Sequence, residues 1–207
     1  MTQAIESSAA TSSLPESIPA PPETAKEQPP EQDSVSQPSA KSSRRPPLEI
    51  TKISPDTLTP AGFYEVWKKL DTFPYFFDDS VKNPFDWAAL MIAPNTAAFL
   101  MGPKENPAGI FWAAQIVKGI SAICSFAALS RQGWGREKEV RAIMKGVAQH
   151  FKLRYFTALT AEPNDAIRHF IRRLGGQKKG TLAEALCYHD VWTTGVINQM
   201  MVRDLEK

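Results

Sequence analysis

The chain has 207 residues and a formal net charge of +2, with 24 Lys and Arg against 22 Asp and Glu. This length allows one domain of ordinary size plus an appendage. The near-neutral balance gives no electrostatic reason to expect nucleic acid or a membrane surface as a partner. No apolar run approaches the ~20 residues of a membrane helix, and the N-terminus lacks the charged-then-apolar order of a signal peptide. We therefore expect a soluble, cytoplasmic protein.

The first 47 residues differ in composition from the rest. They hold 9 of the 17 prolines and no glycine or aromatic residue. Such a segment buries too little apolar area to offset its chain entropy, so we expect a disordered tail over 1–47 and a folded domain over 48–207. The tail is either a solvated leader or an arm that docks on a partner.

The folded part begins with a short strand, indicated by Leu48, Ile50 and Ile53. Thr59-Pro60 then starts a short amphipathic helix. Residues 71–87 are rich in aromatic side chains and broken by two prolines, which predicts a packed cap rather than one element. Within it, Asp78 and Asp79 are either solvated or placed to attract a cationic substrate.

Three apolar runs follow, over 96–101, 109–117 and 120–129. Their short connections predict antiparallel neighbours, because a parallel crossover needs a dozen or more residues. A helix to Phe151 comes next, and its apolar residues recur at helical spacing. These residues are Val140, Ile143, Met144, Val147, Ala148 and Phe151.

The run 155–160 predicts a strand parallel to its predecessor, because a helical crossover leads to it. A second helix starts at Asn164, a good N-cap, and ends at Gly175-Gly176. Two further strands are expected over 182–187 and 191–197. The order of elements predicts an α+β fold with a mixed sheet.

Gly133 and Gly135 lie between a predicted strand and a predicted helix. The first N–H groups of a helix have no intrahelical partner and lie at the positive end of its dipole. Glycines allow that backbone to approach an anion closely, so the arrangement predicts a phosphate-binding turn. An ordinary strand–turn–helix connection would show the same pattern.

Two motifs resemble the GCN5-related N-acetyltransferases, or GNATs. Residues 132–137 (QGWGRE) are similar to the family's Arg/Gln-Gly-x-Gly-x-Gly/Ala loop, and residues 163–176 (PNDAIRHFIRRLGG) to its later helix, which begins near Asn and ends in Leu-Gly-Phe. Gly180-Thr181-Leu182 resembles the glycine turn before the family's sixth strand. The resemblance spans roughly 48–197 and implies a mixed, mostly antiparallel sheet flanked by helices.

The resemblance also implies acetyl-coenzyme A as co-substrate and an amine, on a protein or small molecule, as acceptor. The backbone of the loop would bind the pyrophosphate, and the end of the preceding strand would hold the pantetheine arm and thioester carbonyl. The residues implied in cofactor binding are Ala127, Leu129, Gln132, Gly133, Trp134, Gly135, Arg136 and Asn164.

The chain departs from the family pattern at Gly176, where Phe is usual, and at two positions that bear on the chemistry. Glu137 stands where Gly or Ala is usual, and a carboxylate beside a pyrophosphate is repulsive unless it points away. Ile171 replaces a tyrosine that protonates the leaving thiolate in many members. Cys124, Tyr188 and His189 are candidate replacements or merely structural residues, so no catalytic residue is assigned. The three histidines are too scattered to predict a metal site.

Two functions stay open on the sequence. One is an N-acyltransferase that moves an acetyl group from acetyl-coenzyme A to an amine. The other is a GNAT-shaped binding or structural protein with weak or lost chemistry. The general layout of the chain, a degenerate GNAT with a glycine turn after the second motif, resembles acetyltransferase-like proteins encoded by bacteriophages, some of which are virion components.

Overall fold

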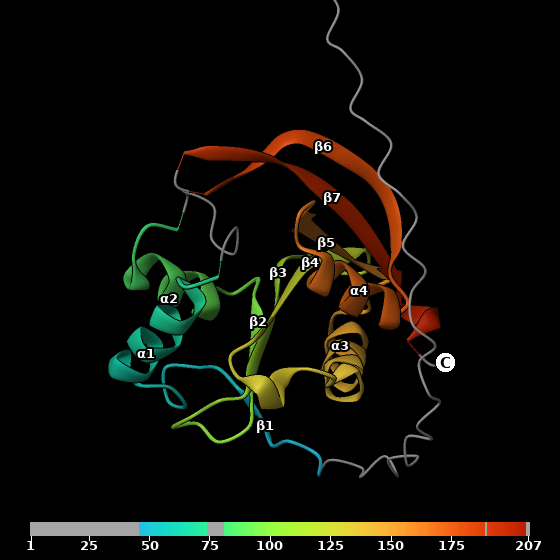
Figure 1. The fold of residues 1–207 in the computed structure, drawn as a ribbon. Helices are drawn as coiled ribbons and strands as arrows, with labels where there is room; N and C mark the ends of the chain where they lie inside the picture. The colour runs from blue at the N-terminus through green and yellow to red at the C-terminus, as the bar shows by residue number, and fades with distance from the viewer. Residues whose placement is uncertain (1–45, 74–80, 189, 206–207) are drawn as a thin grey trace, which may run out of the picture. The chain divides into compact units, whose positions relative to one another are not determined.

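A seven-stranded sheet forms the centre of the computed structural model, which describes residues 46–73, 81–188 and 190–205 (Figure 1). Its strand order is β1-β2-β3-β4-β5-β7-β6. The strands are β1 (Ile50–Lys52), β2 (Ala97–Met101), β3 (Gly109–Val117), β4 (Ser121–Ala128), β5 (Tyr155–Ala161), β6 (Gln177–Tyr188) and β7 (Val191–Met201). Every neighbouring pair is antiparallel except β4–β5, which is parallel. The predicted α+β class and mostly antiparallel sheet are confirmed.

Four helices cover the two faces of this sheet. They are α1 (Pro60–Leu70), α2 (Pro84–Ile92), α3 (Glu137–Phe151) and α4 (Asp165–Arg173). One apolar core joins α1 and α2 to Leu100, Ile110 and Trp112 of the sheet. The other joins α3 and α4 to strand residues of the opposite face, including Phe111 and Phe156. Helices α1 and α2 therefore lie on one face, and α3 and α4 on the other (Figure 1).

The apolar stripe predicted for α3 is buried as a face. Val140, Ile143, Met144, Val147 and Ala148 are buried, and Phe151 packs against the same core. Asn164 caps α4 as predicted, because its side-chain oxygen accepts a hydrogen bond from the Ile167 N–H at 3.3 Å. Both helices therefore turn their apolar positions toward the sheet.

The prediction of an irregular cap over 71–87 was wrong for the residues from Pro84 onward, which are helical. Pro84 does not break an element but begins α2, with Asn83 as N-cap accepting from the N–H groups of Phe85 and Asp86 at 2.9 and 3.0 Å. Residues 74–80, including Asp78 and Asp79, lie outside the described residues, as does the predicted tail up to residue 45. Strands β6 and β7 are also longer than the predicted runs. No helix in the described part of the chain is long and apolar enough to cross a membrane.

Candidate cofactor and active site

Strands β4 and β5 pair only at their beginnings. Their register covers Ser121–Tyr155, Ala122–Phe156 and Ile123–Thr157, and among the described residues no further pair joins them. Beyond this point β4 stays paired with β3 as far as Ala128, and β5 stays paired with β7 as far as Ala161. The two strands therefore diverge and leave a wedge-shaped gap within the sheet.

A cavity of about 500 Å³ occupies this gap. Its walls come from the diverging halves of β4 and β5 and from α3 and α4, and most of the lining is apolar. The lining includes Ala158, whose side chain belongs to the core under α3 and α4, and Ala127, whose side chain belongs to the core under α1 and α2. The cavity thus reaches both faces of the sheet at the one place where the strands part.

The backbone of β4 presents free polar groups to this gap. The Leu129 N–H donates to the Ala108 carbonyl at 2.9 Å, so it points toward β3. Because backbone groups alternate in direction along an antiparallel strand, those of Ala127 also face β3, whereas those of Phe126 and Ala128 face the gap. The resemblance had implied Ala127 and Leu129 as the backbone contacts. Their neighbours Phe126 and Ala128 hold the groups that point the right way.

The turn between β4 and α3 needs its two glycines for different reasons. It opens with η1 (Arg131–Gly133), in which the Ser130 hydroxyl accepts from the Gln132 N–H at 3.3 Å. A Cβ on Gly133 would lie 2.0 Å from the Ala108 carbonyl oxygen, so the glycine is required by packing. Gly135 has φ +72° and no atom within 4 Å of its would-be Cβ, so it is required by conformation and its surroundings are open.

The first turn of α3 keeps its N–H groups available. Its N-cap residue, Arg136, makes no side-chain capping bond, and the first intrahelical bond runs from the Val140 N–H to the Arg136 carbonyl at 3.0 Å. Two carboxylates in this turn are turned to arginines: Glu137 pairs with Arg173 at 2.5 Å and Glu139 with Arg136 at 2.9 Å. Glu137 therefore bonds toward the end of α4, which meets the condition that it point away from a bound anion.

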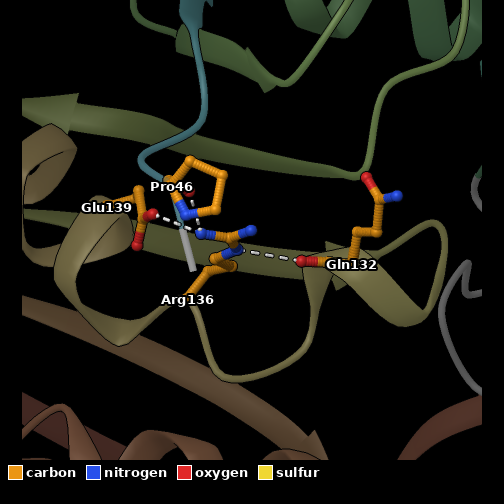
Figure 2. Close-up of polar contacts among 4 residues, drawn as sticks. All are labelled: Pro46, Gln132, Arg136 and Glu139. Carbon is orange, nitrogen blue, oxygen red and sulfur yellow. Dashed lines mark hydrogen bonds and ion pairs between the residues drawn. The ribbon is translucent and has the colours of Figure 1, made fainter. Parts of the chain in front are cut away.

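Arg136 is buried, with only 5% of its surface exposed. Figure 2 shows its guanidinium between the Gln132 carbonyl, the Pro46 carbonyl and Glu139. The resemblance implied Arg136 in cofactor binding. In the structure its side chain is committed to contacts within the protein, so only its backbone belongs to the surface of the turn.

The cavity offers little acid–base chemistry. Cys124 lines it, and burial raises the pKa of this thiol to about 12, so the group is neutral at physiological pH. Ile171 also lines it, at the position where the resemblance implies a tyrosine. The side chain of Tyr188 and all of His189 lie outside the described residues. No group of three or more potential metal ligands occurs in the described part of the chain.

Three of the eight predicted site residues line the cavity itself, namely Ala127, Trp134 and Asn164. Gln132, Gly133, Gly135 and Arg136 form the adjoining turn, and Leu129 follows β4. Sequence reasoning missed the stack of Phe126 on Phe170, which lies in the lining with ring centroids 4.4 Å apart. The apolar spacing of α4 marked Phe170 as buried, but no local pattern in the sequence pairs it with Phe126.

Neither a protein-family model nor a curated protein matches this chain by sequence. Solved structures do match it. A spermidine N-acetyltransferase from Vibrio cholerae, in complex with coenzyme A and spermine, is 12% identical over 77% of this chain and 98% of that one, with a TM-score of 0.61. A ribosomal L7/L12 alpha-N-protein acetyltransferase in complex with coenzyme A is 15% identical over 76% and 96%, with a TM-score of 0.62. A ribosomal-protein-S5-alanine acetyltransferase from Vibrio fischeri is 14% identical over 79% and 97%, with a TM-score of 0.58.

The chain has the GNAT fold. The match covers nearly the full length of each of these acetyltransferases, so the whole architecture is shared and not one motif. At 10–15% identity the likeness concerns the fold, and the chemistry has to be argued from the site. Nothing in these matches points to a bacteriophage protein.

Proposed function

We propose that this protein is an acyl-coenzyme A-dependent N-acyltransferase that moves an acetyl group to an amine of a protein or small molecule. One observation carries the proposal: the gap between β4 and β5 runs beside a helix start whose N–H groups are free. A long acyl carrier with a pyrophosphate at one end and a thioester at the other matches these two adjoining features.

The turn and the start of α3 would hold the pyrophosphate. The backbone of Gly135 is open to approach, and the first N–H groups of the helix provide donors at the positive end of its dipole. The half-buried carboxylate of Glu137, in the first turn of α3, is paired with Arg173. The electrostatics of this end therefore favour an anion.

The gap would hold the pantetheine arm and the thioester. The arm is amphipathic, with amides that pair with free strand groups and methylenes that suit an apolar lining. The groups of Phe126 and Ala128 that face the gap are placed to bond the arm, and one N–H is placed to bond the thioester carbonyl. A fixed donor at the oxygen where negative charge develops is usually the largest single catalytic term.

Acetyl-coenzyme A supplies the activated acyl group as a thioester. The protein has to hold the acceptor nitrogen close to the carbonyl carbon. Because the cavity reaches both faces of the sheet, it has room for the acceptor beside the thioester. The new C–N bond forms as the C–S bond breaks, and the amine loses one proton. Among the described lining residues no carboxylate or imidazole takes that proton. Cys124 is not the acid, because a thiol of pKa about 12 does not protonate a thiolate of pKa roughly 8.5. We infer that water or the leaving thiolate receives it.

The charge of the cavity lining bears on the class of acceptor. The similar structures include a spermidine N-acetyltransferase and a ribosomal L7/L12 alpha-N-protein acetyltransferase, so both a polyamine and a protein N-terminus are candidate acceptors. A polyamine needs carboxylates around it, and the described lining has none. We therefore favour an acceptor with one amine and an otherwise uncharged surrounding, such as a chain N-terminus.

A second function is supported by the same apolar lining. With Ile171 in the cavity and no titratable base among the described lining residues, the protein could bind coenzyme A without transferring its acyl group. The two functions share the binding step and differ in turnover.

Calorimetric titration of the full chain with coenzyme A and acetyl-coenzyme A tests the binding step. At a hundredfold excess over the dissociation constant, a ligand that binds only the folded state adds about 2.7 kcal/mol of apparent stability, seen as a raised melting temperature. Ala166→Trp blocks the cavity from an exposed position on α4, and Ala61→Trp on α1 is the matched exposed control. Binding lost only in Ala166→Trp supports the site.

Thiol release with a set of N-terminal peptides and polyamines then separates the two functions. Release with peptides supports the transferase, and binding without release for any amine supports a binding module. If neither ligand binds at millimolar concentration, the proposal fails and a GNAT-shaped structural protein remains.

A further inference from the structure

Arg136 is an unusual residue for its position. It is the N-cap residue of α3 and follows the exposed Gly135, yet its own side chain is 94% buried. Buried arginines are rare unless all their donors are used. The acceptors of its guanidinium therefore indicate which segments the side chain connects.

The guanidinium has acceptors from three separate parts of the chain. Nε donates to the Gln132 carbonyl at 2.9 Å, and Nη1 donates to the Pro46 carbonyl at 2.8 Å and to Glu139 Oε1 at 2.9 Å (Figure 2). Gln132 belongs to η1, Glu139 to the first turn of α3, and Pro46 lies 90 residues earlier in sequence. One side chain thus ties together both ends of the glycine turn and a segment from outside it.

The bond to Gln132 closes the turn. The main chain between Gln132 and Arg136 consists of Gly133, Trp134 and Gly135, and the two glycines leave it many alternative conformations. The Arg136 backbone carbonyl meanwhile accepts from Val140 to begin α3. The side chain and backbone of one residue therefore join the start of the turn to the start of the helix.

The Pro46 carbonyl is a fixed acceptor. Pro46 precedes Pro47, which restricts it to extended conformations. On the other side, Leu48 packs against the core under α3 and α4, and the Glu49 carbonyl accepts from the Gly102 N–H at 2.7 Å. The Pro46 carbonyl therefore fixes the guanidinium through a segment that lies outside the turn.

We propose that Arg136 is a positioning residue for the phosphate-binding turn, and that the segment at Pro46 acts through it. This inference rests on the proposed function, because it concerns the turn that would hold the pyrophosphate. The guanidinium does not touch the anion. It holds Gly135 and the first N–H groups of α3 in one arrangement, and it neutralises Glu139, whose charge would otherwise oppose an anion at the same helix start.

Arg136→Gln in the full chain is the first test, with Arg141→Gln as the matched control. Arg141 is on the same helix and donates to two backbone carbonyls, those of Asp204 and Arg173, which lie outside the turn. We expect Arg136→Gln to weaken coenzyme A binding about tenfold or more, as expected for lost bonds to a charged group. Arg141→Gln should bind within about twofold of the wild type even where both variants lower the melting temperature. Arg136→Lys should not restore binding, because an ammonium lacks the planar fork that reaches separate acceptors.

A second variant leaves Arg136 in place. Pro46→Gly with Pro47→Gly frees the segment that carries the acceptor, and Pro29→Gly with Pro30→Gly makes the same change in another consecutive proline pair. We expect weaker coenzyme A binding only in the first pair. This variant keeps the inference testable if Arg136→Gln does not fold.

Hydrogen exchange of the ligand-free chain separates this inference from the proposed function. We expect the amides of residues 133–138 to exchange faster in Arg136→Gln than in Arg141→Gln, with β4 and the rest of α3 unchanged. If the wild type does not bind coenzyme A, the proposed function fails whatever the exchange shows. If the wild type binds and the Arg136 and Arg141 variants bind and exchange alike, the positioning role is overturned.

Discussion

Gly133 and Gly135 lie in one turn, but the first is required by lack of space for a side chain and the second by its backbone conformation. Gly133 has no room for a Cβ, because the Ala108 carbonyl occupies that place. Gly135 has room but adopts a left-handed conformation that side chains disfavour. Only Gly135 leaves its backbone open to a ligand, so substitutions at the two positions test different properties.

We expect Gly133→Ala to destabilise the protein more than Gly135→Ala. The first creates a clash with backbone, which costs about 1–3 kcal/mol or more, whereas the second adds only the left-handed penalty of about 1–2 kcal/mol. Urea unfolding of both variants measures the difference. Equal losses would mean that the turn relaxes away from Ala108 without cost.

Cys124 gives a prediction about pH. The folded-state pKa is raised by burial from the ordinary 9.0 to about 12, so between these values the unfolded chain releases a proton that the folded chain keeps. The thiol's contribution to the free energy of unfolding is therefore complete below pH 9 and falls by about 1.4 kcal/mol per pH unit above it. In urea unfolding, we expect the stability difference between wild type and Cys124→Ala to be the same at pH 8 and pH 9 and to shrink at about that rate from pH 9 to 10.5.

The same variant separates structure from chemistry. Because a neutral thiol of such high pKa is neither a base nor an effective acid, Cys124→Ala should keep acyl transfer within a few-fold at pH 8. A loss of several hundredfold in kcat, with coenzyme A binding intact, would give Cys124 a catalytic role that its burial argues against.

At the scale of elements, the sequence predicted the helices and strands that follow from local periodicity. It missed the features that depend on contacts between distant segments. The apolar stripes of α3 and α4, the antiparallel run β2–β4 and the parallel start of β5 follow from spacing and connection length. Helix α2 was missed because Pro84 was taken as a breaker, although proline at the first helical position after an Asn cap is a start signal. The divergence of β4 from β5 and the burial of Arg136 depend on contacts far apart in sequence.

Asn164 combines a structural and a proposed binding role that substitutions can separate. It caps α4 through Ile167 and also lines the cavity. We expect Asn164→Ala to lose about 1 kcal/mol of stability, while Asn164→Ser keeps most of it because serine is also a good N-cap. Coenzyme A titration of the serine variant then measures what the side-chain amide of Asn164 contributes to affinity, apart from its capping role. Unchanged affinity would limit Asn164 to capping.

The two backbone directions of β4 give a sharper test. Ala128→Pro removes an N–H that faces the gap, whereas Ala127→Pro removes one that faces β3 and its ladder. We expect the second to be the more destabilising, and the first to lower acyl transfer or coenzyme A binding about tenfold or more while the fold persists. Thermal melting and thiol release on both variants decide it. The reverse order of stability would show that the alternation along β4 is misassigned.

At the scale of the whole molecule, the sheet has its opening at its single parallel junction. The outer edges of β4 and β5 are satisfied by β3 and β7, so the backbone groups inside the gap are left to solvent or ligand. Helices α3 and α4 share one core across the junction and hold it open. A ligand that bonds both walls would therefore stabilise the entire domain rather than one loop.

Truncation from the N-terminus tests where the folded domain begins. Composition predicted a folded domain from residue 48, and the part of the chain that the structure describes begins two residues earlier, at Pro46. The difference matters because it includes Pro46, whose carbonyl accepts from Arg136. We expect a chain that begins at Arg44 to melt within about 2 °C of the full chain, since less than 1 kcal/mol should change, and to bind coenzyme A equally. A chain that begins at Leu48 lacks one acceptor of a buried guanidinium, which costs about 1–3 kcal/mol, and should melt several degrees lower and bind more weakly. Equal behaviour of the two shortened chains would place the boundary at residue 48 and remove Pro46 from the support of the turn.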